Sequence, residues 1–228
     1  MYGKEMKAKT EKREMNNIEY VRPADIEKRS MEIIASEMRT APPVDHAPVI
    51  RRVIHATADF DYEYSLKFSE SAVAAGLKAL QGGATLVCDT NMARSGINTA
   101  ALGRHNCSAV CFMADPGVAE DAKRRGITRA AVSMEKAAQL SGPLLFVIGN
   151  APTALLRLYE LILEGSVKPE LIIGVPVGFV NVVESKELIK KAGVPYIVAD
   201  GRKGGSTVAA AISNALLYML DEQEGLKR

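Results

Sequence analysis

Three histidines, His46, His55 and His105, are the side chains of this chain best suited to proton transfer near neutral pH. His55 differs from the other two because it lies in the middle of the helix predicted for the segment 44–59, whose apolar residues recur at helical spacing. At about 100° per residue, its side chain points away from that apolar stripe. His55 is therefore the best placed of the three for proton transfer. A structural or solvated role is the alternative, since no Ser-His-Asp arrangement or HExxH motif accompanies it.

A glycine-rich segment, residues 201–206 with the sequence GRKGGS, follows an apolar run. Gly204 and Gly205 let the backbone approach a ligand, Ser206 can donate a hydrogen bond, and the arginine and lysine add positive charge. A phosphate or a carboxylate would fit. The segment has neither the Walker ending nor the dinucleotide fingerprint after a first strand, so nucleotide binding is not supported.

Two other segments have features of anion sites. Residues 149–153, GNAPT, join an apolar run to a helix, with Asn150 or Ala151 in the cap region and Thr153 in the first turn. Helix N–H groups there can bind an anion, and an ordinary turn is an equally good interpretation. Arg129 begins another helix, where the macrodipole disfavours a cation, so it indicates either a bound anion or a solvated face.

Short apolar runs that alternate with helical segments indicate an α/β fold from residue 84 onward. The predicted strands are 84–89, 108–113, 143–149, 170–176 and 196–200, and the helices are 116–126, 128–140, 151–165, 180–193 and 205–220. Right-handed crossovers then give a three-layer α/β/α domain with a five-stranded parallel sheet. Ligands of such sheets gather at the carboxyl ends of the strands, where the segments described above lie.

Amphipathic patterns over residues 22–38 and 44–59 predict two N-terminal helices ahead of the sheet. Residues 1–17 are rich in Lys, Glu and Arg with almost nothing to bury, which predicts a mobile basic tail. The rest, residues 18–228, is the right length for a single domain.

Charge and composition exclude several classes of partner. The 29 basic and 27 acidic residues nearly cancel, so nucleic acid and anionic membranes are not expected partners. No apolar run reaches about 18 residues and no charged-then-apolar leader is visible, which predicts a cytoplasmic protein. The three cysteines lack metal-type spacing, so neither zinc nor disulfides are expected.

Six segments together resemble the precorrin-8X or cobalt-precorrin-8 methylmutases of cobalamin biosynthesis. They are EKRSMEII at 27–34, RVIHATAD at 52–59, CDTNMARSGI at 88–97, GNAPTAL at 149–155, GVPVGFVNVVESK at 174–186 and GRKGGS at 201–206. The resemblance spans residues 18–217, in the family's order and spacing, and the GNAPTAL, PVGFV and GRKGGS segments are specific in combination.

The resemblance implies an isomerase with a flavodoxin-like strand order. Its reaction would move a methyl group from C-11 to C-12 of a tetrapyrrole within one molecule, giving a hydrogenobyrinic or cobyrinic acid framework. The family's histidine falls on His55, which would protonate or hydrogen-bond the ring-C nitrogen. No methyl donor, cofactor or metal is implied, and relatives are homodimers with the site near the subunit interface.

The implied substrate carries many carboxylates around a flat ring, and charge-assisted hydrogen bonds would position it. The residues implied to bind it are Ser30, Asn98, Arg129, Asn150, Thr153, Gly204, Gly205 and Ser206. Arg129 and Ser30 match the family best, whereas Asn98 stands where relatives often have threonine.

Two alternatives to the enzyme stay open at this point. One is a carrier that binds the corrinoid product without converting its precursor, and the other is a flavodoxin-like enzyme that binds phosphate at residues 201–206. No residue indicates whether the substrate contains cobalt.

Overall fold

The computed structural model describes residues 19–226, which fall into two compact units that meet in sequence at Glu37 and Met38. The first unit holds a 3-10 turn, η1 (Pro23–Asp25), and helix α2 (Ile26–Glu37). This confirms the helix predicted over 22–38, with Pro23 at its beginning, where its missing N–H has no cost. The predicted mobile tail, residues 1–17, lies outside the described residues. Within residues 19–226, the helices are too short or too polar to cross a lipid bilayer.

The second unit is built on one six-stranded sheet with the order β1-β6-β5-β4-β2-β3. The strands are β1 (Leu66–Phe68), β2 (Thr85–Cys88), β3 (Ser108–Val110), β4 (Leu144–Ile148), β5 (Leu171–Gly174) and β6 (Tyr196–Ala199). The strands β2 to β6 are parallel to one another and coincide with the five predicted strands. Numbered among themselves, they have the order 2-1-3-4-5 of flavodoxin-like sheets.

The prediction of a wholly parallel, five-stranded sheet is wrong at one edge. Strand β1 pairs antiparallel with β6, with Leu66 opposite Ala199, and makes the sheet mixed. It has three residues, too few to show the alternation by which a strand is recognised in a sequence.

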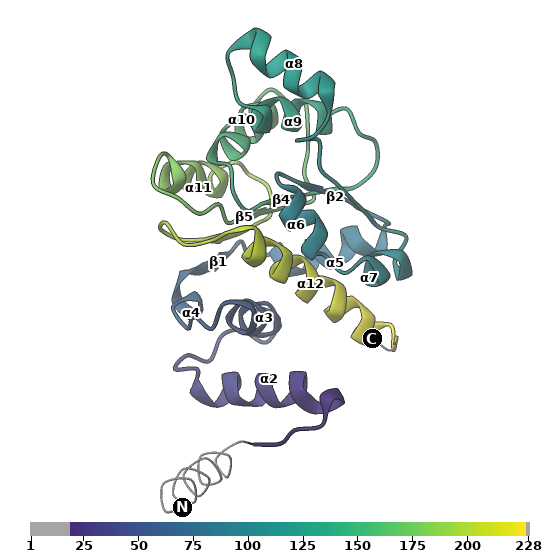
Figure 1. Cartoon of the computed structure of the whole chain (residues 1–228), viewed down its shortest axis with the longest axis vertical. Coiled ribbons are helices and arrows are strands. Elements are labelled where there is room, and N and C mark those ends of the chain that lie inside the picture. Colours follow the sequence, from purple (N-terminus) through teal and green to yellow (C-terminus); the bar gives the residue numbers. More distant parts are fainter. Residues whose placement is uncertain (1–18, 227–228) are drawn as a thin grey trace, which may run out of the picture. The chain divides into compact units, whose positions relative to one another are not determined.

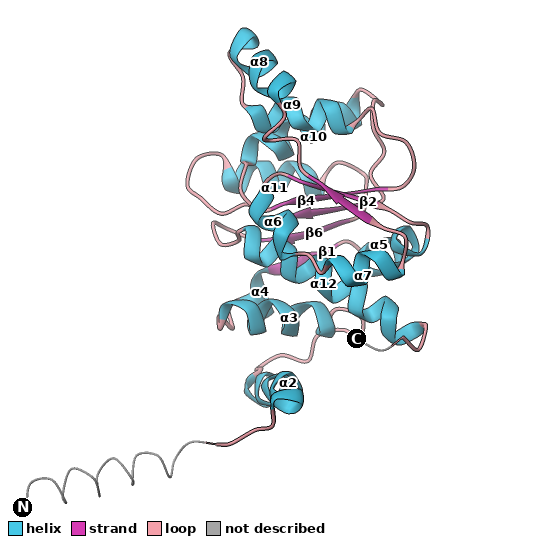
Figure 2. Cartoon of the chain, turned by 45° about the vertical axis from the view of Figure 1, so that its right-hand side comes forward, coloured by secondary structure: helices cyan, strands magenta, loops and turns pink. Residues whose placement is uncertain are grey.

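Helices cover both faces of the sheet (Figures 1 and 2). Helices α5, α6, α7 and α12 lie together on one face, with α3 packed on α12, and α9, α10 and α11 lie on the other, with α8 beside α9. Their bounds are α3 (Ala47–Thr57), α4 (Tyr62–Ser65), α5 (Ala72–Gln81), α6 (Asn91–Gly96), α7 (Thr99–Arg104), α8 (Pro116–Arg125), α9 (Arg129–Ala137), α10 (Pro152–Leu163), α11 (Val182–Lys190) and α12 (Ser206–Gln223).

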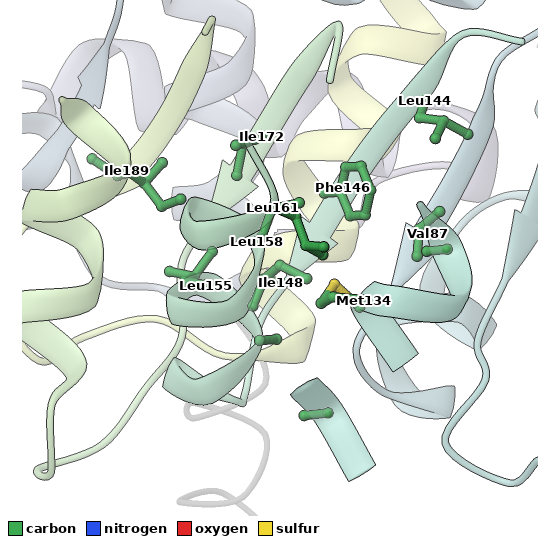
Figure 3. Close-up of a cluster of buried hydrophobic side chains, with 14 residues drawn as sticks. Val87, Met134, Leu144, Phe146, Ile148, Leu155, Leu158, Leu161, Ile172 and Ile189 are labelled. Carbon is green, nitrogen blue, oxygen red and sulfur yellow. The ribbon is translucent and has the colours of Figure 1, made fainter. Parts of the chain in front are cut away.

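The core follows the alternation of the strands. In β4, Phe146 and Ile148 face the helices α9 and α10, where Leu155 and Leu158 pack against them (Figure 3). The alternate residues of β4, Leu145 and Val147, point to the opposite face and are also buried, because helices cover that face too. Burying one such side chain contributes about 1.5 to 3 kcal/mol. These strands therefore read in the sequence as unbroken apolar runs.

A buried carboxylate joins α12 to α7. Asp221 accepts hydrogen bonds from Nε and Nη2 of Arg104, at 2.9 and 2.6 Å, and lies 2.9 Å from Nε2 of His105. The bonds from Arg104, followed by the contact with His105, hold the pKa of Asp221 below its ordinary value. His105 thus has a structural position, away from the carboxyl ends of the strands.

We expect Asp221→Asn to lower the free energy of unfolding by about 3 kcal/mol at neutral pH, because Arg104 would lose its buried partner. A carboxylate with a depressed folded-state pKa stabilises the fold above its ordinary pKa of 3.8 and loses that effect as the pH falls below it. Urea unfolding at several pH values should therefore show the difference from wild type shrinking below about pH 4. The more exposed Asp121→Asn should cost less than about 1 kcal/mol. A difference at pH 3 as large as at pH 7 would contradict this account.

Candidate active site at the carboxyl edge of the sheet

The strand order creates a switch point between β2 and β4. The chain leaves β2 for β3 on one side and then returns to β4 on the other side. Residues that follow these two strands, Asp89 and Gly149, therefore begin a crevice of the kind in which α/β proteins bind ligands. The segments 175–181 and 200–205, after β5 and β6, end at the same edge, so the fold gathers the predicted segments there.

Asp89 organises the turn that follows β4. It is fully buried, and its carboxylate accepts N–H bonds from Gly149 at 2.9 Å, Asn150 at 2.8 Å and Ala151 at 2.7 Å. Burial raises the pKa of Asp89, and the three N–H donors oppose that shift. The backbone N–H groups considered as an anion site thus already bind an internal carboxylate. The exposed side chain of Asn150 stays a predicted contact for substrate.

We expect Asp89→Asn to lower the free energy of unfolding by about 2 kcal/mol, since an amide NH2 would face N–H donors in a buried site. The loss should appear in thermal or urea unfolding at neutral pH. The matched control is Asp115→Asn, near the surface, which should cost less than about 1 kcal/mol because asparagine caps a helix about as well as aspartate and only the ion pair with Lys136 is lost. An Asp89→Asn protein as stable as wild type would mean that these three bonds contribute little.

The glycines of the loop 201–205 allow two backbones to pack closely. Gly204 has φ +153°, and a Cβ on it would lie 2.1 Å from the carbonyl oxygen of Val175. The N–H of Gly205 donates to that same oxygen at 2.8 Å. Packing within the protein therefore explains the glycines, and ligand binding by this loop stays a prediction.

Ser206 ties the glycine-rich loop to the switch point. It is the first residue of α12, and its Oγ lies 2.8 Å from Oγ1 of Thr90, which caps α6. A Cβ on Gly149 would lie 2.7 Å from the Cα of Ser206, so the turns after β2, β4 and β6 touch one another. Asn150, Gly204, Gly205 and Ser206 are consequently neighbours at one edge of the sheet.

His55 is exposed on the last turn of α3, while Val49, Ile50, Val53 and Ile54 are buried. This confirms the predicted orientation. One turn beyond His55, Asp59 accepts a bond of 2.7 Å from Nζ of Lys203, and Asp61 accepts another of 2.6 Å. The glycine-rich loop therefore lies against the segment that follows α3, and the candidate acid is close in the fold to the predicted carboxylate-binding loop.

Arg129 and Thr153 begin neighbouring helices. Thr128, which precedes Arg129 and caps α9, donates to Oγ1 of Thr153 at 2.8 Å. A hollow of about 440 Å³ between α9 and α10 adjoins this pair. Its Arg125 and Arg157 both bind the carboxylate of Glu135, so those guanidinium groups already have partners. The exposed Arg129 is the better candidate to meet a substrate carboxylate.

The two remaining predicted residues belong to other elements. Asn98 caps α7 by accepting from Ala101 N at 3.0 Å, and its Nδ2 donates to Tyr218 Oη at 3.1 Å. Its amide is used in joining α7 to α12, and the structure does not bring it to the carboxyl edge. Ser30 belongs to the first unit, where its hydroxyl donates to the Ile26 carbonyl at 2.9 Å.

Comparison with known proteins identifies the family of this chain. A family model described as CbiC, precorrin-8X methylmutase, matches residues 25–219. The chain belongs to the precorrin-8X methylmutase family. It is 45% identical to a cobalt-precorrin-8 methylmutase of Priestia megaterium, over 88% of this chain and 90% of the relative. It is 41% identical to a precorrin-8X methylmutase of Pseudomonas aeruginosa, over 87% of this chain and 97% of the relative.

A solved structure of a precorrin-8X methylmutase from Thermus thermophilus superposes with a TM-score of 0.81 and 40% identity, covering 90% of this chain and 98% of that one. The overall fold is thus shared with a methylmutase, and membership in this family makes the chain an isomerase. The predicted family is confirmed.

In this methylmutase, Lys186 is a residue of the carboxyl edge that the sequence analysis missed. Its Nζ donates to the carbonyl oxygens of Gly201 and Lys203, both at 2.9 Å. A signal was present, since Lys186 occupies the buried stripe of α11 between Val182 and Ile189, where an apolar residue is expected.

Proposed function

We propose that this protein moves the methyl group on C-11 of precorrin-8X or cobalt-precorrin-8 to C-12, producing hydrogenobyrinic or cobyrinic acid for cobalamin biosynthesis. The observation that carries this proposal is the family match over residues 25–219, which includes His55 and the whole carboxyl edge of the sheet. Relatives named for both substrates are 45% and 41% identical to this chain, so both belong to the proposal.

His55 acts as the acid in the proposed reaction. Its exposed ring, one turn from the segment held by Lys203, would donate a proton or hydrogen bond to the ring-C nitrogen of the substrate. That interaction draws electrons from the neighbouring carbon, which can then accept the methyl group. The methyl group stays within one molecule, so no donor is consumed.

The substrate carboxylates are held by side chains and backbone around this edge. We assign this role to Arg129, Asn150, Thr153, Gly204, Gly205 and Ser206. Ser30, in α2 of the first unit, is proposed as a further substrate contact. Arg129 supplies a full positive charge, and the hydroxyl, amide and N–H groups supply directed hydrogen bonds. Several weak, well-placed contacts suit a large ring with carboxylates along its rim.

A homodimer in the cytoplasm, each chain with one domain over residues 18–228, completes the proposal. The family model runs through the boundary between the two units, which supports a single functional domain. Val177, Phe179 and Val180 are exposed beside the carboxyl edge, Phe179 at 82%. A group of large apolar side chains in water supports either a partner subunit or the flat face of the ring as its cover.

The test is a visible spectrum of each substrate, with and without cobalt, mixed with the protein. The shift restores conjugation across C-11, so conversion changes the absorption spectrum. Turnover of many substrate molecules per protein supports the methylmutase. Binding of the ring without any spectral conversion would support the corrinoid carrier instead and contradict the proposal.

A further inference from the structure

Lys186 is a charged side chain in an apolar position. It is 1% exposed and lies on the inner face of α11, on the same stripe as the buried Val182 and Ile189. Burial lowers the pKa of Lys186 to about 8, against the opposing influence of Asp200. Such a position is unfavourable for an ammonium unless directed hydrogen bonds compensate for the lost water.

Two carbonyl groups of the glycine-rich loop provide those bonds. Nζ of Lys186 donates to the oxygens of Gly201 and Lys203, each at 2.9 Å, and so holds both ends of a three-residue bend. Gly201 has φ +72°, a left-handed conformation that glycine adopts readily. The ammonium stands behind the loop, on the side away from solvent.

The bend fixed by Lys186 leads directly to the predicted binding residues. After Lys203 the chain enters Gly204 and Gly205, whose close packing on Val175 tolerates little displacement. The side chain of Lys203 also reaches Asp59 and Asp61, in the segment that follows the helix of His55. A change in the bend would therefore move the backbone that is proposed to bind carboxylates, and the anchor of the segment after α3 as well.

We propose that Lys186 is a positioning residue for substrate binding, which fixes the bend 201–203 so that Gly204 and Ser206 present their polar groups to a carboxylate of the tetrapyrrole. It does not touch the reacting atoms. This role rests on the proposed methylmutase activity. The role of Lys186 predicts an effect on the affinity for the tetrapyrrole, whereas the proposed activity concerns the methyl shift itself.

The experiment compares steady-state kinetics of wild type and Lys186→Met, a substitution that keeps the length and apolar stem and removes the ammonium. We expect the KM for the tetrapyrrole to rise about tenfold or more, with kcat within about threefold of wild type. Lys190→Met is the matched control. Lys190 lies one turn further along α11 and pairs with Glu187 and Asp200 instead of the loop carbonyls, so its KM should stay near wild type.

Hydrogen exchange keeps the test decisive if stability also changes. Peptides that cover residues 200–207 should exchange faster in Lys186→Met, while those of β4 and β5 keep wild-type protection. If Lys186→Met does not fold, Lys186→Gln is the second variant. Its side chain keeps two N–H donors but is shorter, so it should not reach both carbonyl oxygens and should show the same rise in KM. If the folded Lys186→Met variant has the kcat and the KM of wild type, the role of Lys186 is overturned and the proposed function is not. If the wild-type protein itself does not convert the tetrapyrrole, the proposed function is overturned and this role with it.

Discussion

Replacement of His55 by Ala should lower kcat by about 10² to 10⁴-fold, which is the usual contribution of a positioned general acid. His55 is exposed, so the free energy of unfolding should stay within about 0.5 kcal/mol of wild type. Affinity for the rearranged corrin should also persist, since the carboxylate contacts come from other elements. Stopped-flow absorbance measures kcat. Titration of the protein with the rearranged corrin, followed by protein fluorescence quenching or by absorbance, measures the affinity for the product.

The matched control for His55→Ala is His46→Gln, at the other end of the same helix. His46 stacks on Phe68 with ring centroids 4.0 Å apart, which is a structural contact. Its replacement should leave kcat within about threefold of wild type. If His55→Ala turns over as fast as wild type, His55 is not the acid, and the proton must come from another group at the carboxyl edge.

Gly204→Ala should lower the free energy of unfolding by about 4 kcal/mol or prevent recovery of folded protein. The new Cβ would lie 2.1 Å from the carbonyl oxygen of Val175, and a backbone at φ +153° is strained for any residue with a side chain. The bond from Gly205 N to Val175 O would also be broken or lengthened. Urea unfolding gives the loss of stability. Any folded fraction should bind the tetrapyrrole poorly, because the displaced backbone belongs to the proposed binding loop.

Gly201→Ala separates the backbone strain from the steric clash. Gly201 also has a positive φ, +72°, but a Cβ there would meet no atom within 4 Å. Its replacement should therefore cost only about 1 to 2 kcal/mol, the usual penalty for a left-handed residue. Equal losses for the two variants would show that the contact with Val175 contributes nothing beyond strain.

The long elements of this fold were predictable from the sequence because each follows one simple rule. Strands β2 and β4 to β6 are buried on both faces and read as apolar runs, and α10 and α12 are long enough to show helical periodicity. Helices α6 and α7 have only six residues each, and β1 has three, so no period could be recognised. Helix α5 contains Gly76, a poor helix former, which is needed because a Cβ would lie 2.9 Å from Leu171.

The site was predictable in its segments but not in its internal bonds. The glycines, the GNAPT turn and the exposed His55 follow from residue type, helical spacing and family resemblance. The carboxylate of Asp89 accepts hydrogen bonds from the N–H groups of the turn after β4. These bonds depend on the switch in strand order, which brings together residues 60 positions apart in the sequence. The two carbonyl bonds of Lys186 likewise depend on how α11 packs beside β6, so the lysine alone could not indicate them.

The most direct measurement follows the migrating methyl group itself. Substrate labelled with ¹³C in the methyl group on C-11 is incubated with wild-type protein, and the product is examined by NMR. The account predicts that the label is retained in the same molecule and appears as the methyl group on C-12, with a neighbouring C-11 that has become part of the conjugated system. A label that stays on C-11 while the ring is bound, or that is lost from the ring, would contradict the assignment of this chain as a methylmutase of the tetrapyrrole.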